Sequence, residues 1–297
     1  MSIRLEMLQV ARVAPKLLGD STDLVRQFIR SQFNPDGSGR DRDGEPDIYY
    51  TVFCLESALA LQMPDCATAT RGYLQSMGDG EDLDFIHLCC LIRAWACVGM
   101  PNTSPLWRRN VRDRIATFRT ADGGYAIDPR GPGTAYGCFL GLAAHQDLRE
   151  PLPAPEGLVT CLDSLRTKDG GWSNVATIQG RATGGATLAT AAATTVLRHL
   201  NTPIPEEVEP WLRAQAHPQG GFRAAPDAPI PDLLTTATVL HTLSGLGADL
   251  TSLQEPCLDL VDSLWTNAGG FHGHWADDHL DAEYTYYALL ALGHLAL

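Results

Sequence analysis

The sequence predicts an all-α protein in which six helical hairpins form two concentric rings, an (α/α)6 toroid. A Gly-Gly-aromatic triplet recurs four times, at steps of 47, 50 and 49 residues. An amphipathic stretch precedes each triplet and an almost wholly apolar stretch follows it. A fixed period of this size is typical of repeat architectures in which each repeat is one supersecondary unit. The triplets are Gly123-Gly124-Tyr125, Gly170-Gly171-Trp172, Gly220-Gly221-Phe222 and Gly269-Gly270-Phe271, with a degenerate copy at Asp36-Gly37-Ser38-Gly39.

The stretches before the glycines carry apolar residues at i, i+3, i+4 and i+7 with charges between them, which predicts amphipathic helices. These outer helices are expected at residues 23–32, 67–76, 106–118, 156–165, 206–215 and 253–265. The stretches after the glycines are too long, and too rich in Ala and Leu, for strands. A helix that is apolar all round is a buried helix. These inner helices are expected at residues 49–61, 85–98, 134–144, 188–197, 233–246 and 283–297.

The contrast between inner and outer helices favours a closed ring over an open superhelical solenoid. A ring buries one helix of every hairpin completely, whereas a solenoid usually leaves one helix of each pair partly wet. The glycines are expected to serve as helix C-caps and as left-handed turn residues. No linker divides the chain, so we expect one domain over residues 1–297, with a helical cap at 1–20 and six repeats over about 22–297.

The composition of the chain argues against several classes of function and partner. The net charge of −13 argues against nucleic acid and anionic membranes as partners, because phosphate binding needs clustered Lys and Arg. The 8 cysteines lie mostly in apolar helical stretches without a C-x-x-C pair, which predicts buried free thiols. No signal-peptide pattern and no membrane-spanning apolar run is present, so we expect a soluble cytoplasmic protein.

Aspartate begins four of the six inner helices: Asp47, Asp84, Asp232 and Asp281. As helix N-caps, these side chains accept hydrogen bonds from free backbone N–H groups and suit the positive end of the helix. In a ring, the inner helices all run in one direction, so their starts meet at one mouth. The same residues are therefore expected both to cap helices and to line a functional opening.

These features resemble the β subunits of protein prenyltransferases and the squalene–hopene cyclase group. The strongest single match is Gly269-Gly270-Phe271 followed by Asp281-x-x-Tyr284-Thr285, and the resemblance covers roughly residues 22–297. It implies a central cavity, lined by the inner helices, that takes a polyisoprenoid chain. For the transferase β subunits it also implies a helical α partner; a homo-oligomer is the other assembly considered.

The resemblance carries over few catalytic residues. The transferases bind zinc through an Asp-x-Cys in a late repeat and an Asp-x-x-His in the last one. Asp232 and Asp281 stand at the two aspartate positions, but Leu234 replaces the cysteine and Tyr284 replaces the histidine. The Asp-x-Asp-Asp acid of the cyclases would begin at Asp232, where both later carboxylates are absent, so the usual proton donor is missing.

The loop before the last helix offers replacement metal ligands. Residues 272–283 contain three His and four carboxylates. His272 and His274 in a His-x-His pattern, with Asp281 and Asp232 from the family pattern, are therefore candidate ligands for zinc, and magnesium is the other ion considered. The alternative is a solvated acidic loop in which the histidines have no ligand role.

Two carboxylate-containing pairs are candidates for catalysis. Asp84 and His87 lie three residues apart on one helix face, so Asp84 is positioned to orient His87 as a base or ligand. A core histidine satisfied by its own aspartate is the alternative. Asp281 and Glu283, two apart at a helix start, are expected to raise one another's pKa and to supply a proton.

Aromatic side chains suit an isoprenoid chain or a cation, although aromatics at helical spacing are often plain core. The candidates are Tyr49, Tyr50, Tyr136, Trp172, Phe222 and Tyr284. A prenyl diphosphate also requires cationic side chains near the mouth. The arginines in turn regions are Arg40, Arg42, Arg130, Arg181 and Arg223.

The leading hypothesis is an isoprenoid-binding enzyme, similar to prenyltransferase β subunits, that acts on a prenyl diphosphate in a central apolar cavity with divergent catalytic and metal residues. One alternative is a non-catalytic toroid subunit that binds an isoprenoid or a protein. Another is a terpene cyclase-like protein with non-standard acids. Carbohydrate-active enzymes on six-hairpin toroids form a third class, for which Asp84 and Asp281 would have to act as paired acids.

Overall fold

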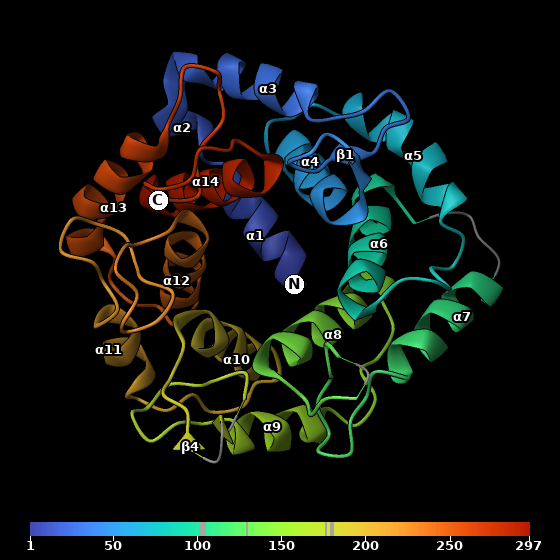
Figure 1. The fold of residues 1–297 in the computed structure, drawn as a ribbon, viewed down its shortest axis with the longest axis vertical. Coiled ribbons are helices and arrows are strands. Elements are labelled where there is room, and N and C mark those ends of the chain that lie inside the picture. The colour runs from blue at the N-terminus through green and yellow to red at the C-terminus, as the bar shows by residue number, and fades with distance from the viewer. Residues whose placement is uncertain (101–104, 129, 176, 179–180) are drawn as a thin grey trace.

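A computed structural model of the chain describes residues 1–100, 105–128, 130–175, 177–178 and 181–297. Within these residues, helical hairpins form two concentric rings (Figure 1). The inner ring consists of α4 (Ile48–Ala60), α6 (Phe85–Val98), α8 (Ala135–Leu148), α10 (Thr187–His199), α12 (Leu233–Gly245) and α14 (Ala282–Leu295). The outer ring consists of α3 (Thr22–Ser31), α5 (Cys66–Ser76), α7 (Pro105–Ala116), α9 (Pro155–Ser164), α11 (Val208–Arg213) and α13 (Thr251–Leu264).

The inner ring is closed. Each inner helix contacts the next one along the chain, and the last, α14, packs against the first, α4. Helices α3 and α13, which begin and end the outer ring, lie near one another in Figure 1. The (α/α)6 toroid is therefore confirmed, and the open solenoid is wrong for this chain.

The helix boundaries follow the apolar pattern closely, except that α11 is two residues shorter at each end than predicted and α8 is longer. Helix α6 has the bounds that the sequence predicts, whereas α8 runs on to Leu148 instead of ending at residue 144. The polar residues of its last turn are buried: the hydroxyl of Tyr125 lies 3.2 Å from Nε2 of His145, and Arg4 pairs with Asp147. Polar residues with buried partners therefore extend this helix beyond its apolar stretch.

The repeated glycines form turns rather than helix C-caps. The first glycine of each triplet has a φ between +87° and +99°, the left-handed region that side chains disfavour. Its N–H closes a turn onto the carbonyl three residues earlier, as from Gly170 to Thr167. The helix before this turn has already ended, with Leu165 as its C-cap. The predicted C-cap role is thus wrong, while the left-handed turn is confirmed.

Four short strands accompany these turns, and the sequence did not indicate them. They form two antiparallel pairs, β1 with β2 and β3 with β4. Their bounds are β1 (Gly39–Arg40), β2 (Pro46–Asp47), β3 (Thr177–Ile178) and β4 (Arg181–Ala182). The β1–β2 hairpin matters for the site because its loop carries Arg42.

The N-terminal residues close one end of the ring. They form α1 (Ile3–Ala11), α2 (Pro15–Leu18) and a 3-10 turn, η1 (Gly19–Ser21). Helix α1 lies across the centre of the ring and contacts α4, α8 and α14 (Figure 1). Ile3, Met7, Leu8 and Ala11 are the residues it buries. This helix gives the ring a floor.

The sequence predicts buried free thiols, and most of the cysteines fit that prediction. All eight cysteines are free, and six of them are buried. None of the helices in the described residues is both long and apolar enough to cross a membrane.

Candidate functional site

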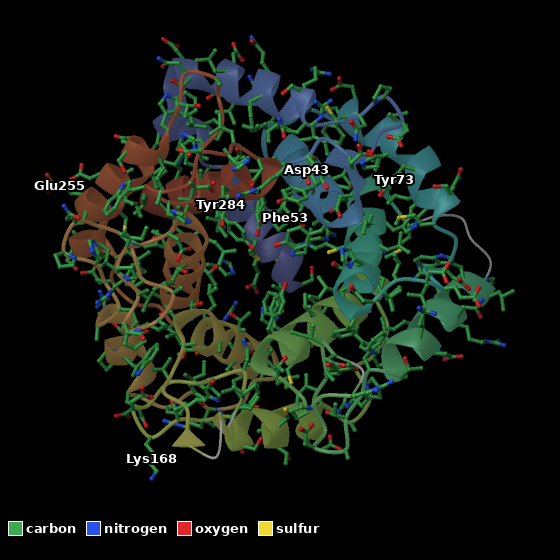
Figure 2. All side chains as sticks on the ribbon, viewed as in Figure 1. Asp43, Phe53, Tyr73, Lys168, Glu255 and Tyr284 are labelled. Carbon is green, nitrogen blue, oxygen red and sulfur yellow. The ribbon has the colours of Figure 1, made fainter. Side chains whose placement is uncertain are left out.

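A cavity of about 260 Å³ lies at the centre of the ring. All six inner helices contribute to its wall, and Met7 of α1 contributes from the floor. Figure 2 places Phe53 and Tyr284 at the inner edge of the ring, whereas Lys168 and Glu255 lie at its outer rim. The other lining residues are mostly apolar or aromatic: Val52, Phe53, Cys89, Cys90, Tyr136, Phe139, Leu140, Ala143, Ala144, Leu188, Ala191, Ala192, Leu234 and Tyr287.

Polar contacts hold α1 over the end of the cavity where the inner helices terminate. Arg4 donates to Asp147 at 2.9 Å, and both side chains are largely buried. Glu6 pairs with Arg198 and lies 3.3 Å from His199, at the end of α10. Burial raises the pKa of Asp147 to about 6, against the opposing effect of Arg4. Since α1 covers this end, the end where the inner helices begin is the candidate mouth of the cavity.

That opening is surrounded by helix N-caps, as the sequence predicts. Asp47, Asp84, Asp232 and Asp281 each accept a hydrogen bond from the backbone N–H three residues later, at 2.7–2.9 Å. Thr134 caps α8 in the same way at 2.8 Å. These caps explain why the polar residues gather at one end of the ring.

Glu283 is the carboxylate at the mouth with a direct connection to the cavity. The hydroxyl of Tyr49, a cavity-lining residue, donates to its Oε1 at 2.5 Å. Burial is the main reason that the pKa of Glu283 is raised to about 7, and the charge of Asp281 adds to the effect. A carboxyl group with this pKa exchanges protons near neutral pH. Tyr49 connects it to any ligand in the cavity.

Asp281 has a different environment. Arg42 donates from Nε to its Oδ2 at 2.9 Å and also pairs with Asp277 at 3.0 Å. Burial raises the pKa of Asp281 although Arg42 opposes the shift. The guanidinium of Arg42 also lies 5.5 Å from the ring centroid of Tyr284. Arg42 thereby joins the first hairpin to the last.

The residues at the mouth do not fit a zinc ion. Among the described residues, no three His, Cys, Asp or Glu side chains gather in a metal-binding arrangement. Nδ1 of His272 lies 2.9 Å from the backbone carbonyl of His279, and Nδ1 of His274 accepts from a backbone N–H. Asp281 is engaged by Arg42, while Asp232 is bonded to both the backbone N–H and the hydroxyl of Thr235. The predicted ligand set is therefore not assembled, and no metal step follows from this site.

Asp84 and His87 form the predicted pair, with Nδ1 of His87 2.8 Å from Oδ2 of Asp84. Both side chains are exposed to solvent, and neither lines the central cavity. Burial, the largest single effect, acts to raise the pKa of Asp84, but the hydrogen bonds from the N–H and ring of His87 and the charge of that ring together lower it. Their arrangement is that of a helix cap at the rim. Asp84 and Asp281 consequently do not face one another across the cavity as paired acids.

The aromatic candidates separate into three groups. Tyr49 and Tyr136 line the cavity. Tyr50 and Tyr284 lie at the mouth beside Arg42, outside the lining. The prediction that Trp172 and Phe222 line the cavity is wrong. Both side chains are fully buried within their hairpins and are absent from the cavity lining. Trp172, for example, donates from Nε1 to the carbonyl of Leu162 in the outer helix α9.

Of the turn-region arginines, Arg42 and Arg223 are engaged by protein groups. Arg42 is paired with two aspartates, and Arg223 donates to backbone carbonyls. Arg130 is exposed. Nε of Arg40 is buried without a hydrogen-bond partner among the described residues. The side chain of Arg181 lies outside the described residues.

Sequence reasoning missed a buried ion pair next to the cavity. Arg93 of α6, a lining residue, donates to both carboxylate oxygens of Glu56 in α4, at 2.7 and 2.5 Å. Each is the one Lys, Arg, Asp or Glu in its helix. A single charge in an otherwise apolar buried helix was the available signal, because such a charge requires a partner.

Comparison with known proteins agrees with this architecture. Residues 190–296 match the prenyltransferase alpha-alpha toroid domain family. No curated protein matches the chain. Among solved structures, it is similar to a form of the type II terpene cyclase MstE from Scytonema, with 14% identity, a TM-score of 0.64 and coverage of 95% of this chain and 97% of that one. Other MstE structures hold geranylgeranyl dihydroxybenzoate as substrate or merosterolic acid A as product.

An enzyme of a different class shares the fold. An alpha-1,6-mannanase from Salegentibacter has 13% identity and a TM-score of 0.62, with 94% of this chain and 98% of that chain covered. Identities this low bear on the fold alone. With its closed ring of six helical hairpins the chain has the α/α toroid fold, and its residues 190–296 match the prenyltransferase alpha-alpha toroid domain family.

Proposed function

We propose that the protein binds an isoprenoid chain in its central cavity and acts on it as a terpene cyclase-like enzyme, with Glu283 and Tyr49 as the proton-transfer pair. The observation that carries this proposal is the lining of the cavity. Its wall combines aromatic rings with aliphatic side chains, which suits a hydrocarbon chain and can stabilise a cation by π contact. The terpene cyclase MstE, which shares the fold, is known in complex with a geranylgeranyl compound.

The same lining argues against sugar hydrolysis. A glycosidase needs two carboxyl groups on opposite sides of the scissile bond. Among the described residues that line the cavity, Asp147 is the one carboxylate, and it is bonded to Arg4 at the floor. This chain therefore shares its fold with a mannanase, but its cavity lining does not contain the two opposed carboxyl groups that a glycosidase needs.

The charge of the mouth favours a neutral substrate over a prenyl diphosphate. Asp232, Asp281 and Glu283 lie at the inner helix starts, and Arg42 is already paired with Asp281 and Asp277. A diphosphate at this opening would face these carboxylates, and the charge of Arg42 is already compensated by its two aspartates. Proton transfer to a neutral chain is the chemistry that remains.

The proposed step is an isomerisation and requires no co-reactant. Protonated Glu283 gives its proton through the hydroxyl of Tyr49 to one carbon of a double bond in the chain, which leaves the positive charge on the other carbon of that bond. The cation that forms is attacked by a neighbouring double bond, which makes a carbon–carbon bond and moves the positive charge along the chain. Loss of a proton from the final cation to the Glu283 carboxylate restores the enzyme.

The cavity size limits the chain length. About 260 Å³ lies just below the roughly 300–1,000 Å³ of typical small-molecule sites. We therefore expect C10 to C15 chains to fit better than C30 chains. Thermal-shift measurements with C10 to C30 isoprenoids, as hydrocarbons, alcohols and diphosphates, test binding directly. No shift with any of them, together with a shift for mannose oligosaccharides, would contradict the proposal.

Product analysis separates an enzyme from a binding protein. With a chain that binds, we expect Glu283→Gln to lose turnover by about 10²–10⁴-fold, while binding persists. Tyr49→Phe should also lose turnover, because it removes the hydroxyl that connects Glu283 to the cavity. Tyr73→Phe on the outer helix α5 is the matched control. Binding without any product in the wild-type protein would instead favour the non-catalytic alternative.

An α-subunit-like protein partner stays a prediction of the family resemblance, and a homo-oligomer stays the alternative assembly. Mass measurement of the protein from its native source, with and without added isoprenoid, tests it.

A further inference from the structure

The cavity wall contains hydrogen-bond donors that the protein leaves unused. A guanidinium group has five N–H groups. Arg93 uses Nε and Nη2 on Glu56, but no described residue accepts a hydrogen bond from its Nη1. Its side chain is 19% exposed and lines the cavity, while that of Glu56 is completely buried. The two N–H groups of Nη1 are therefore open to an acceptor in the cavity that Arg93 lines.

Two tyrosine hydroxyls lie in the same region. Tyr136 of α8 and Tyr287 of α14 both line the cavity, and neither hydroxyl is bonded to a described residue. Burial raises the pKa of both hydroxyls, so both are protonated donors, and the nearby charge of Arg93 opposes the rise in each. Tyr49 differs, because its hydroxyl is engaged by Glu283. Three side chains from three inner helices thus bring unused donors into the same cavity: α6 and α8 are neighbours in the ring, and α14 stands across the ring from α8.

The wall formed by α10 and α12 is less polar. These helices contribute mostly small or aliphatic side chains: Leu188, Ala191, Ala192 and Leu234. The exception is His241 near the end of α12, whose Nε2 is buried without a partner among the described residues. The lining threonines of these helices, Thr195 and Thr238, already donate to carbonyls of their own helices. A ligand that satisfies both walls has a hydrocarbon side and an oxygen atom directed at Arg93.

We propose that Arg93, Tyr136 and Tyr287 form a subsite for a neutral oxygen atom, a carbonyl or hydroxyl group, carried by the isoprenoid ligand. The inference rests on the proposed function, because it specifies the ligand of the same cavity. A neutral oxygen is favoured over a carboxylate because Glu56 already compensates the charge of Arg93. A second anion would add an unpaired charge to a poorly solvated chamber.

A matched series of ligands tests the subsite. Binding of a C10 isoprenoid hydrocarbon, and of the alcohol, aldehyde and carboxylic acid of the same skeleton, is measured by calorimetry. The wild-type protein should bind the aldehyde or alcohol at least about threefold more tightly than the hydrocarbon. Tyr136→Phe and Tyr287→Phe should each weaken binding of the oxygenated ligands by about three- to tenfold and leave the hydrocarbon unchanged. Tyr73→Phe should change neither.

A double variant tests the guanidinium without leaving an unpaired charge. Arg93→Met combined with Glu56→Leu removes both members of the pair and should abolish the preference for oxygen. Equal affinity for the hydrocarbon and the oxygenated ligands in the wild-type protein would overturn the subsite, as would a preference that survives all three variants. Tightest binding by the carboxylic acid would overturn the assignment to a neutral group. If no member of the series binds, including the hydrocarbon, the proposed function itself fails.

Discussion

The hydroxyl of Tyr49 lies 2.5 Å from Oε1 of Glu283 and joins the first inner helix to the last, although 234 residues separate them in the sequence. The contact crosses the seam where the ring closes. It places a carboxyl group that is buried, and has a pKa of about 7, behind a hydroxyl that faces the cavity. The closure of the ring is thus also what assembles the proposed proton-transfer pair.

Glu283→Gln should change how stability depends on pH. Burial first, and the charge of Asp281 second, raise the pKa of Glu283 from 4.5 to about 7. Between these values the folded protein holds a proton that the unfolded chain releases. The stability from this proton is fully present below about pH 4.5 and is lost as the pH rises through 7. The difference corresponds to at most roughly 3 kcal/mol.

Urea denaturation at several pH values measures this effect. The wild-type free energy of unfolding should fall between about pH 4.5 and 7, and the fall should be smaller in Glu283→Gln. Glu255→Gln changes an exposed glutamate on the outer helix α13 and should keep the wild-type profile. Equal slopes for the wild type and Glu283→Gln would show that Glu283 keeps an ordinary carboxylate pKa.

Arg42→Met should destabilise the seam of the ring. Asp281 is 2% exposed and would lose its cationic partner. Breaking a fully buried pair costs about 3–5 kcal/mol. Arg42 is 33% exposed, so solvent screening reduces the expected loss to about 1–3 kcal/mol. The loss should be larger at high pH than at low pH, because removal of Arg42 raises the pKa of Asp281 further and protonation removes the unpaired charge.

Two further variants make the test of Arg42 specific. Arg112→Met removes an arginine from the exposed pair with Asp113 and should change stability by less than about 0.5 kcal/mol. Asp281→Asn added to Arg42→Met should recover part of the loss and remove its pH dependence. A double variant that is no more stable than Arg42→Met alone would contradict the assignment of the loss to an unpaired Asp281.

Much of the fold could be predicted because its determinants are local. The helix at 85–98 has the bounds observed for α6, since an apolar run between an N-capping Asp84 and a glycine is a short-range signal. The mouth was predictable for the same reason, because N-caps mark helix starts and a ring brings the starts together.

The parts of the site that depend on distant residues could not be predicted. Arg42 meets Asp281 across 239 residues, and nothing near either position indicates the other. The prediction for Trp172 and Phe222 was wrong because the sequence does not show whether an aromatic residue after two glycines points toward the inner or the outer ring of helices. Their backbone turns direct them into the hairpin, where Trp172 finds a carbonyl partner on the outer helix. Arg93 and Glu56 left a local sign as single charges, but their partnership required the packing of α4 on α6.

Metal removal should leave the protein unchanged. The positions that would complete a zinc site carry Leu234 and Tyr284, and Asp281 is held by Arg42. A metal that contributed to folding would raise the apparent stability by mass action. We therefore expect the same melting temperature with and without a chelator, and elemental analysis without stoichiometric zinc. A chelator-dependent fall in melting temperature that His274→Ala abolishes would restore the metal hypothesis.

Gly293→Ala should destabilise the protein by loosening α1. Gly293 lies in α14, where alanine is intrinsically better by about 0.8–1 kcal/mol. Its added Cβ, however, would lie 2.1 Å from the carbonyl oxygen and 2.6 Å from the carbonyl carbon of Val10. These are backbone atoms of α1, so the clash can be relieved only by moving the helix. Overpacking of this kind costs about 1–3 kcal/mol, which outweighs the gain in propensity.

Gly72→Ala on the outer helix α5 is the matched control, since its Cβ would meet nothing within 4 Å. It should stabilise the protein by about 0.5–1 kcal/mol through propensity alone. Urea denaturation gives both free energies, and hydrogen exchange over residues 3–11 reports whether α1 opens in Gly293→Ala. If Gly293→Ala stabilises the protein as Gly72→Ala does, then α1 moves away from α14 at little cost. The floor of the cavity would then be a loosely held cover, and a ligand could enter from that end as well as from the mouth.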